Sequence, residues 1–121
     1  MKLSSHSINW AKNHIQNYYD SDFYVKPFEF QGLWSNWEEV KEYLTGTDIN
    51  KFTVKNPITY PAPKIKNGFR IVHQLDPIDA LVYSALAYEI SDYVEKNRVN
   101  KNDTVCSYRI NTDGNGNFFS D

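Results

Sequence analysis

The stretch KIKNGFRIVHQLDPID, residues 64–79, contains the signals that decide the fold. Asn67 and Gly68 suit the positive φ angles of a tight hairpin turn, and strand-forming residues lie on both sides of them. The stretch therefore predicts a two-stranded hairpin over residues 64–72.

A helix is predicted directly after the hairpin. Asp76 is a good N-cap, Pro77 suits the first helical position, and Asp79 favours the positive end of the helix dipole. The apolar residues that follow predict a single stripe along this helix: Ile78, Leu81, Val82, Ala85, Leu86, Ile90, Tyr93 and Val94.

The residues before the hairpin predict two further helices. The first spans about residues 6–19, with Ser5 or Ser7 as its cap, and residues 23–30 read as an extended segment. A capping-box pattern at residues 35–38 opens a short second helix that Gly46 is placed to end.

The remaining segments predict loops and short strands. Three prolines make residues 47–63 a loop and an edge strand, because proline cannot donate to a strand ladder. Residues 105–110 predict another short strand, and residues 113–116 a turn. Together these elements predict an α+β fold.

Composition narrows the class of protein. The chain has 121 residues, of which 40% are hydrophobic and 23% charged, as in a soluble globular protein. It has neither an apolar run long enough for a membrane span nor a signal-peptide pattern at its first residues. Its single cysteine excludes an internal disulfide and a multi-cysteine zinc site. A cytoplasmic protein is therefore expected.

The charge distribution indicates a phosphate-contacting surface. Net charge is only −2, but residues 51–75 contain no acid. The cationic or titratable residues of this window are Lys51, Lys55, Lys64, Lys66, Arg70 and His73. Lysine and arginine on a two-stranded hairpin present spaced cations to phosphate oxygens, so a triphosphate or a nucleic-acid backbone is the expected partner.

Other chemistry has weaker support. Cys106 lies in a strand-like run, where a buried small hydrophobe is favoured over a nucleophile. Residues 111–116 match the opening of a calcium loop, but a polar turn is the stronger interpretation. The carboxylates of Asp20 and Asp22 could serve two-metal chemistry, but a turn at the helix exit is favoured.

Three stretches together resemble bacterial reverse transcriptases of the antiviral-defence and abortive-infection type. The first comprises WAKNHI (10–15), DSD (20–22) and PFEF (27–30); the others are FRIVHQLDPIDALVY (69–83) and VCSYR (105–109). The resemblance implies an N-terminal helical extension over residues 1–50 and part of the fingers subdomain over residues 51–121, packed as one unit. It also implies helices packed on a small antiparallel hairpin.

The resemblance implies roles for four residues. Arg70 matches the fingers arginine that contacts the triphosphate of the incoming nucleotide, and Lys64 or Lys66 matches the lysine of the same hairpin. Arg109 matches a position near template or primer. The implied partners are an RNA or DNA template-primer, a deoxynucleoside triphosphate and the remaining polymerase domains in cis or in trans, with no membrane.

No catalytic residue is expected among these 121 residues. The metal-binding aspartates of the family lie in the palm, and the sequence as given ends before their motifs. Mg²⁺ is therefore expected only with the palm, and the chain alone is expected to be inactive. Two alternatives are a stand-alone nucleic-acid-binding module and a protein-interaction module derived from such fingers.

Overall fold

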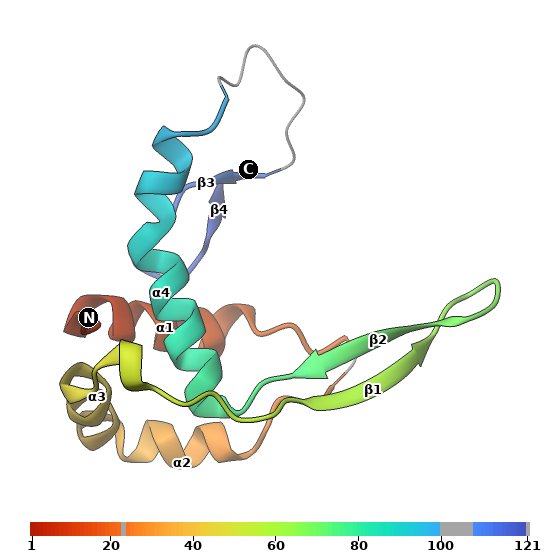
Figure 1. Ribbon diagram of the computed structural model, residues 1–121, viewed down its shortest axis with the longest axis horizontal. Helices are drawn as coiled ribbons and strands as arrows, with labels where there is room; N and C mark the ends of the chain where they lie inside the picture. The colour runs from red at the N-terminus through yellow and green to blue at the C-terminus, as the bar shows by residue number, and fades with distance from the viewer. Residues whose placement is uncertain (23, 100–107, 121) are drawn as a thin grey trace.

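The computed structural model describes residues 1–22, 24–99 and 108–120 and shows an α+β fold (Figure 1). The helices of the described residues are α1 (Ser5–Tyr18), α2 (Glu29–Ser35), α3 (Trp37–Gly46), the 3-10 helix η1 (Ile49–Lys51) and α4 (Pro77–Lys96). The strands are β1 (Ile58–Pro63) with β2 (Phe69–Gln74), and β3 (Arg109–Ile110) with β4 (Phe119–Ser120), each pair antiparallel. The predicted α+β class is confirmed.

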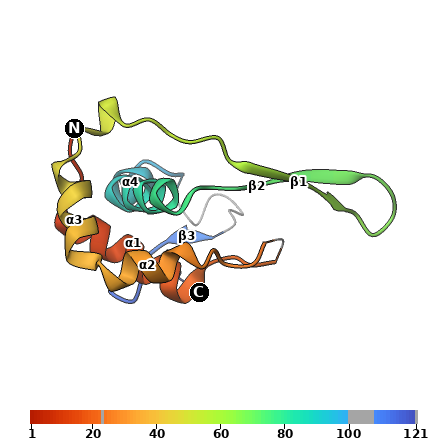
Figure 2. The same ribbon diagram turned by 90° about the horizontal axis from the view of Figure 1, so that it is seen from below.

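The hydrophobic core is built by helices. Its buried residues are Leu3, Ile8, Ala11, Ile15, Phe30, Trp37, Leu44, Leu81, Val82 and Ala85. None of them belongs to β1 or β2, and the hairpin formed by these strands extends away from the helices in two perpendicular views (Figure 1 and Figure 2). The core helices pack on one another and the β1–β2 hairpin projects from them, whereas the small antiparallel β3–β4 pair lies against α4.

Helix α1 lies against α4 along its buried side. Its N-cap is Ser4, whose hydroxyl accepts a hydrogen bond from the Ser7 amide at 3.1 Å. The predicted caps, Ser5 and Ser7, lie one and three residues too late. After the helix, the amide of Asp22 donates to the carboxylate of Asp20 at 2.9 Å. This local bond confirms the helix-exit turn.

Helices α2 and α3 correct two predictions. Residues 29 and 30 are helical rather than extended, and Phe30 is buried in the core. Ser35 is the last residue of α2, where its hydroxyl donates to the carbonyl of Gln31 at 2.9 Å. It therefore cannot cap the next helix, and the predicted capping box does not form. Helix α3 nevertheless ends at Gly46 as predicted.

Helix α4 starts as predicted but buries less than predicted. The carboxylate of Asp76 accepts a hydrogen bond from the amide of Ile78 at 3.0 Å, which confirms the cap. The predicted apolar stripe is not buried along its whole length, because Ile90 and Tyr93 are 54% and 73% exposed. The C-terminal half of α4 rises past the other helices of the described residues, and none of those helices covers Ile90 or Tyr93 (Figure 1).

The hairpin differs from the prediction in its register. The ladder closes at the pair Pro63 and Phe69, so residues 64–68 form a loop and the first strand lies earlier than predicted. The Lys64 amide donates to the Gly68 carbonyl at 3.0 Å, and Asn67 and Gly68 take φ angles of 153° and 78°, positive as predicted. The predicted edge strand within residues 47–63 is confirmed as β1, which contains two of the prolines.

The turn at residues 113–116 is confirmed, and side chains of α1 bind the main-chain carbonyls of this turn. Four α1 side chains bind its carbonyls: Trp10 binds Asp113, Asn13 binds Gly114, Asn17 binds Asn115 and His14 binds Gly116, at 2.7–3.1 Å. The structure shows residues 109–110 of the predicted strand 105–110 as β3; Cys106 lies outside the described residues.

We expect Gly116→Ala to destabilise the chain. Gly116 has a φ of 91°, and an added Cβ would overlap the backbone of Asn13 and His14. Left-handed strain and a backbone clash together cost roughly 2–4 kcal/mol of unfolding free energy. Urea denaturation measures the loss. Gly114→Ala is the control, because nothing lies near its added Cβ, and an equal effect of both variants would contradict the clash.

Candidate nucleic-acid interface

The basic residues gather at the far end of the β1–β2 hairpin. Lys64 and Lys66 lie in the loop that joins the strands, and both are exposed. Arg70 is the second residue of β2, opposite Ala62, and is also exposed. The structure therefore brings three of the four predicted site residues together on one projecting element.

The two faces of the hairpin differ in character. Residues directly opposite in an antiparallel ladder share a face, and successive residues alternate between faces. One face, here called the open face, carries Thr59, Pro61, Pro63, Phe69, Ile71 and His73, all exposed. Phe69 and Ile71 are 68% and 60% exposed. The open face is thus apolar and aromatic and contains no acid.

The opposite face is partly covered by the segment that follows α1. The hydroxyl of Tyr24 donates to the carbonyl of Ile58 at 3.3 Å, and its ring contacts Tyr60 with ring centroids 6.1 Å apart. The side-chain amide of Gln74 donates to the carbonyl of Val25 at 3.2 Å. These contacts anchor the base of the hairpin and leave the open face outward.

The start of α4 uses one cation of the acid-free window. Lys55 Nζ lies 2.8 Å from the carboxylate of Asp76, and this hydrogen bond and the charge of Asp76 raise the pKa of Lys55. The backbone amide of Lys55 donates to Asp79 at 2.9 Å. Lys55 therefore fastens the approach to β1 onto α4, and the acids of the Asp76–Asp79 segment are structural, as expected.

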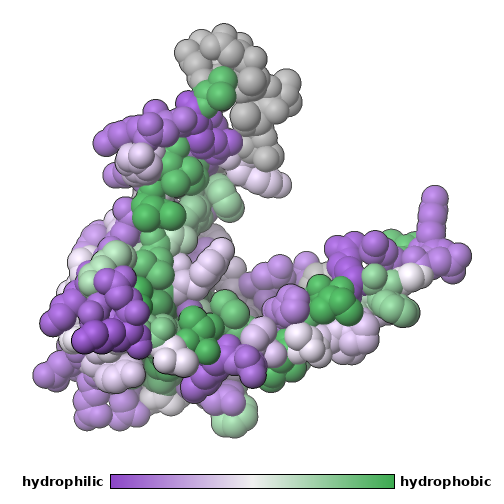
Figure 3. Space-filling model, in the orientation of Figure 1, coloured by the Kyte–Doolittle hydropathy of each residue, from purple (hydrophilic) through white to green (hydrophobic). Residues whose placement is uncertain are grey.

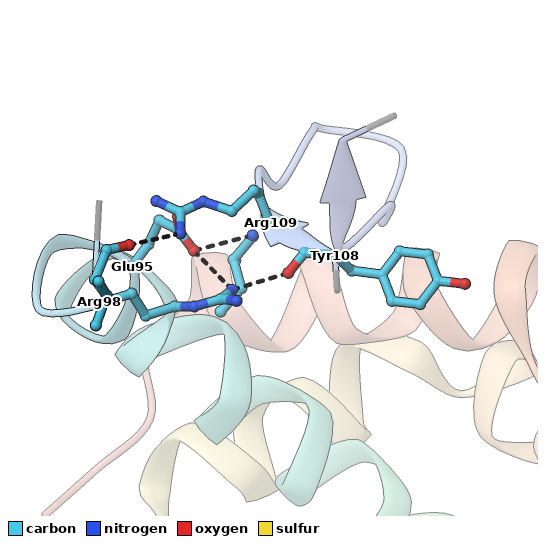
Figure 4. A network of polar contacts seen from close by, with 6 residues as sticks. Glu95, Arg98, Tyr108 and Arg109 are labelled. Atoms are coloured by element: carbon cyan, nitrogen blue, oxygen red, sulfur yellow. Dashed lines mark hydrogen bonds and ion pairs between the residues drawn. The ribbon is translucent and has the colours of Figure 1, made fainter. Parts of the chain in front are cut away.

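Arg109 lies apart from the hairpin, on β3 beside the C-terminal half of α4. Its Nε is 2.6 Å from Glu95, which also accepts hydrogen bonds from Arg98 at 3.3 Å and from the amide of Ile110 at 3.1 Å (Figure 4). A second bond runs from Arg98 to the carbonyl of Tyr108 at 2.8 Å. In this structure Arg109 ties the end of α4 to β3, and its contact with template or primer stays a prediction.

Two features of this region were not anticipated from the sequence. The open face becomes visible only when the strand register is known, although the alternation of Phe69 and Ile71 with Arg70 was present in the sequence. The Glu95 network joins residues on either side of a long connection, and no local pattern indicates that pairing.

The part of the chain that the structure describes contains no group of three or more histidine, cysteine, aspartate or glutamate side chains that could hold a metal ion. Among the described helices, none combines the length and the apolar character that crossing a membrane requires.

No family model matches the chain, and no curated protein or solved structure matches it either.

We expect Glu95→Ala to lower the unfolding free energy by about 1–3 kcal/mol, because it leaves two arginines and a backbone amide without their shared acceptor. Thermal and urea denaturation measure the change. Asp92→Ala removes an exposed carboxylate one turn earlier on α4 and should change stability by no more than about 0.5 kcal/mol. Equal stability of the two variants would show that the network contributes nothing.

Proposed function

We propose that this chain is the fingers part of an RNA-directed DNA polymerase of a bacterial defence system, and that its β1–β2 hairpin contacts nucleotide and template. The observation that carries the proposal is the hairpin itself. It projects from the helices, places Lys64, Lys66 and Arg70 near its end, and carries an apolar face in a segment without acids. The resemblance to reverse transcriptases adds the polymerase class.

The charges of the hairpin support binding to phosphates. Lys64 and Lys66 are exposed, and no acid occurs within residues 51–75 to neutralise them locally. Cations that neutralise phosphates release condensed counterions, and this release gives affinity that falls with salt. Arg70, which alternation places on the face opposite the open face, adds a planar fork that can engage two phosphate oxygens.

The open face supports binding to bases. Single strands bind to proteins that combine a basic track with aromatic side chains on which bases stack. Phe69 is the exposed aromatic of the open face and lies between the lysines of the loop and Ile71. A strand that follows the lysines with its phosphates can therefore place a base on Phe69.

Replacing both loop lysines tests the phosphate contacts. We expect Lys64→Ala with Lys66→Ala to weaken binding of a labelled single strand and of an RNA–DNA template-primer. If each lysine neutralises one phosphate, the slope of log K against log salt falls by about 1.4 for a single strand. Fluorescence anisotropy across a salt series measures both quantities.

The matched control for charge is Lys2→Ala with Lys96→Ala, which removes two exposed lysines far from the hairpin along the sequence. We expect this pair to keep most of the affinity and the full slope. Equal losses in both double variants would indicate nonspecific attraction, and no binding by the unaltered chain at low salt would overturn the proposal.

Replacing the aromatic of the open face tests base stacking. We expect Phe69→Ala to weaken single-strand binding by the equivalent of about 1–3 kcal/mol while the salt slope stays unchanged. Phe28→Ala is the control, because Phe28 is an 80% exposed phenylalanine outside the hairpin. A change in salt slope with Phe69→Ala would contradict a stacking role.

The polymerase class has a separate test at the gene. A reading frame that encodes the palm aspartates is expected after codon 121 or in a neighbouring gene. If binding is observed but no such frame exists, the chain is a stand-alone nucleic-acid-binding module. That outcome would overturn the polymerase class alone.

A further inference from the structure

Helix α4 carries an exposed apolar stripe on a side that no other helix of the described residues covers. The stripe, here called the α4 seam, consists of Tyr83, Leu86, Ile90 and Tyr93. All but the partly buried Leu86 are more than half exposed. Figure 3 shows a hydrophobic band along α4. The steps of three, four and three residues are those of the a and d positions of a coiled coil, so the seam fits another helix.

The spacing of the four seam residues is the same in both directions along the helix. Its positions are symmetric about residue 88, since Leu86 and Ile90 lie two residues from that centre and Tyr83 and Tyr93 lie five. When two copies of α4 run antiparallel, Leu86 meets Ile90 and Tyr83 meets Tyr93, twice each. An interface between identical subunits related by a two-fold axis must be self-complementary in this way.

A pocket lies at one end of the seam. The pocket is about 150 Å³ in volume and is lined by Phe52, Val54, Leu75, Asp79, Val82, Tyr83 and Leu86. A cavity of about this size can hold one aromatic ring. The antiparallel arrangement brings Tyr93 of the second copy beside Tyr83, at the pocket.

Asp79, one of the residues that line the pocket, has one carboxylate oxygen that is buried and unsatisfied. Asp79 is 5% exposed, and its Oδ1 has no hydrogen-bond partner among the described residues, while its Oδ2 accepts from the Lys55 amide. A buried acceptor without a donor destabilises a protein.

We propose that a second copy of this chain docks on the α4 seam, antiparallel and around a two-fold axis, with each Tyr93 inserted into the pocket of the other copy. The seam from Tyr83 to Tyr93 is about 15 Å long at 1.5 Å per residue, which is short for an interface. Association in the micromolar range is therefore expected, strengthened by any further contacts of the whole protein.

Sedimentation velocity over a concentration series tests the association. We expect the unaltered chain to shift from monomer to dimer, and Ile90→Glu to raise the dissociation constant by more than about tenfold, because it buries a charge in the seam. Val25→Glu is the control, since it adds the same charge at an apolar residue that is 89% exposed and outside the seam. It should leave the dimer intact.

Disulfide trapping tests the direction of the helices in a Cys106→Ser background. A disulfide needs Cβ atoms about 3.5–4.5 Å apart. We expect a mixture of Leu86→Cys and Ile90→Cys chains to form the mixed disulfide faster than either chain forms a disulfide with itself. Faster self-linking would indicate parallel helices and overturn the arrangement, as would an unaltered chain that stays monomeric at every concentration.

Discussion

The contact of Trp10 with α4 and with the 113–116 turn is the interaction on which the rest of the structure depends. The indole ring stacks on Tyr88 with ring centroids 4.6 Å apart, and its N–H donates to the carbonyl of Asp113 at 2.8 Å. One buried side chain thus joins the first helix, the last helix and the C-terminal strands. A tryptophan suits this position because it combines a large apolar surface with a single directional donor. The hairpin then takes its direction from the start of α4, to which Lys55 fastens it.

Local features of the fold could be predicted from the sequence where one residue settles the geometry. Asp76 caps α4 and Gly46 ends α3 because each acts on the backbone next to it. The predicted capping box at Ser35 does not form, because Ser35 is the last residue of the preceding helix α2. The sequence alone did not indicate α2, which buries Phe30 in the core. How much of the apolar stripe on α4 is buried could not be predicted either, because the burial depends on how far α1 reaches along α4.

In the candidate site too, local features could be predicted from the sequence and features set by distant contacts could not. Lys64, Lys66 and Arg70 could be assigned to one hairpin because a turn of a few residues fixes their neighbourhood. The open face and the pairing of Arg109 with Glu95 could not, because they depend on strand register and on a contact between distant segments. Sequence patterns therefore predict best those site residues that lie close together on one short element.

The prolines of β1 have a consequence for what the projecting hairpin can join. Successive backbone nitrogens of a strand point to opposite edges of that strand. The Lys64 amide donates across the hairpin to Gly68, so the backbone nitrogens of residues 61 and 63 point the other way, toward the free edge of β1. Both residues are proline and have no N–H to offer there. A third strand that approached this edge would find two donors missing in succession. On the β1 side, the hairpin can thus expose apolar side chains to a ligand while resisting the addition of another strand.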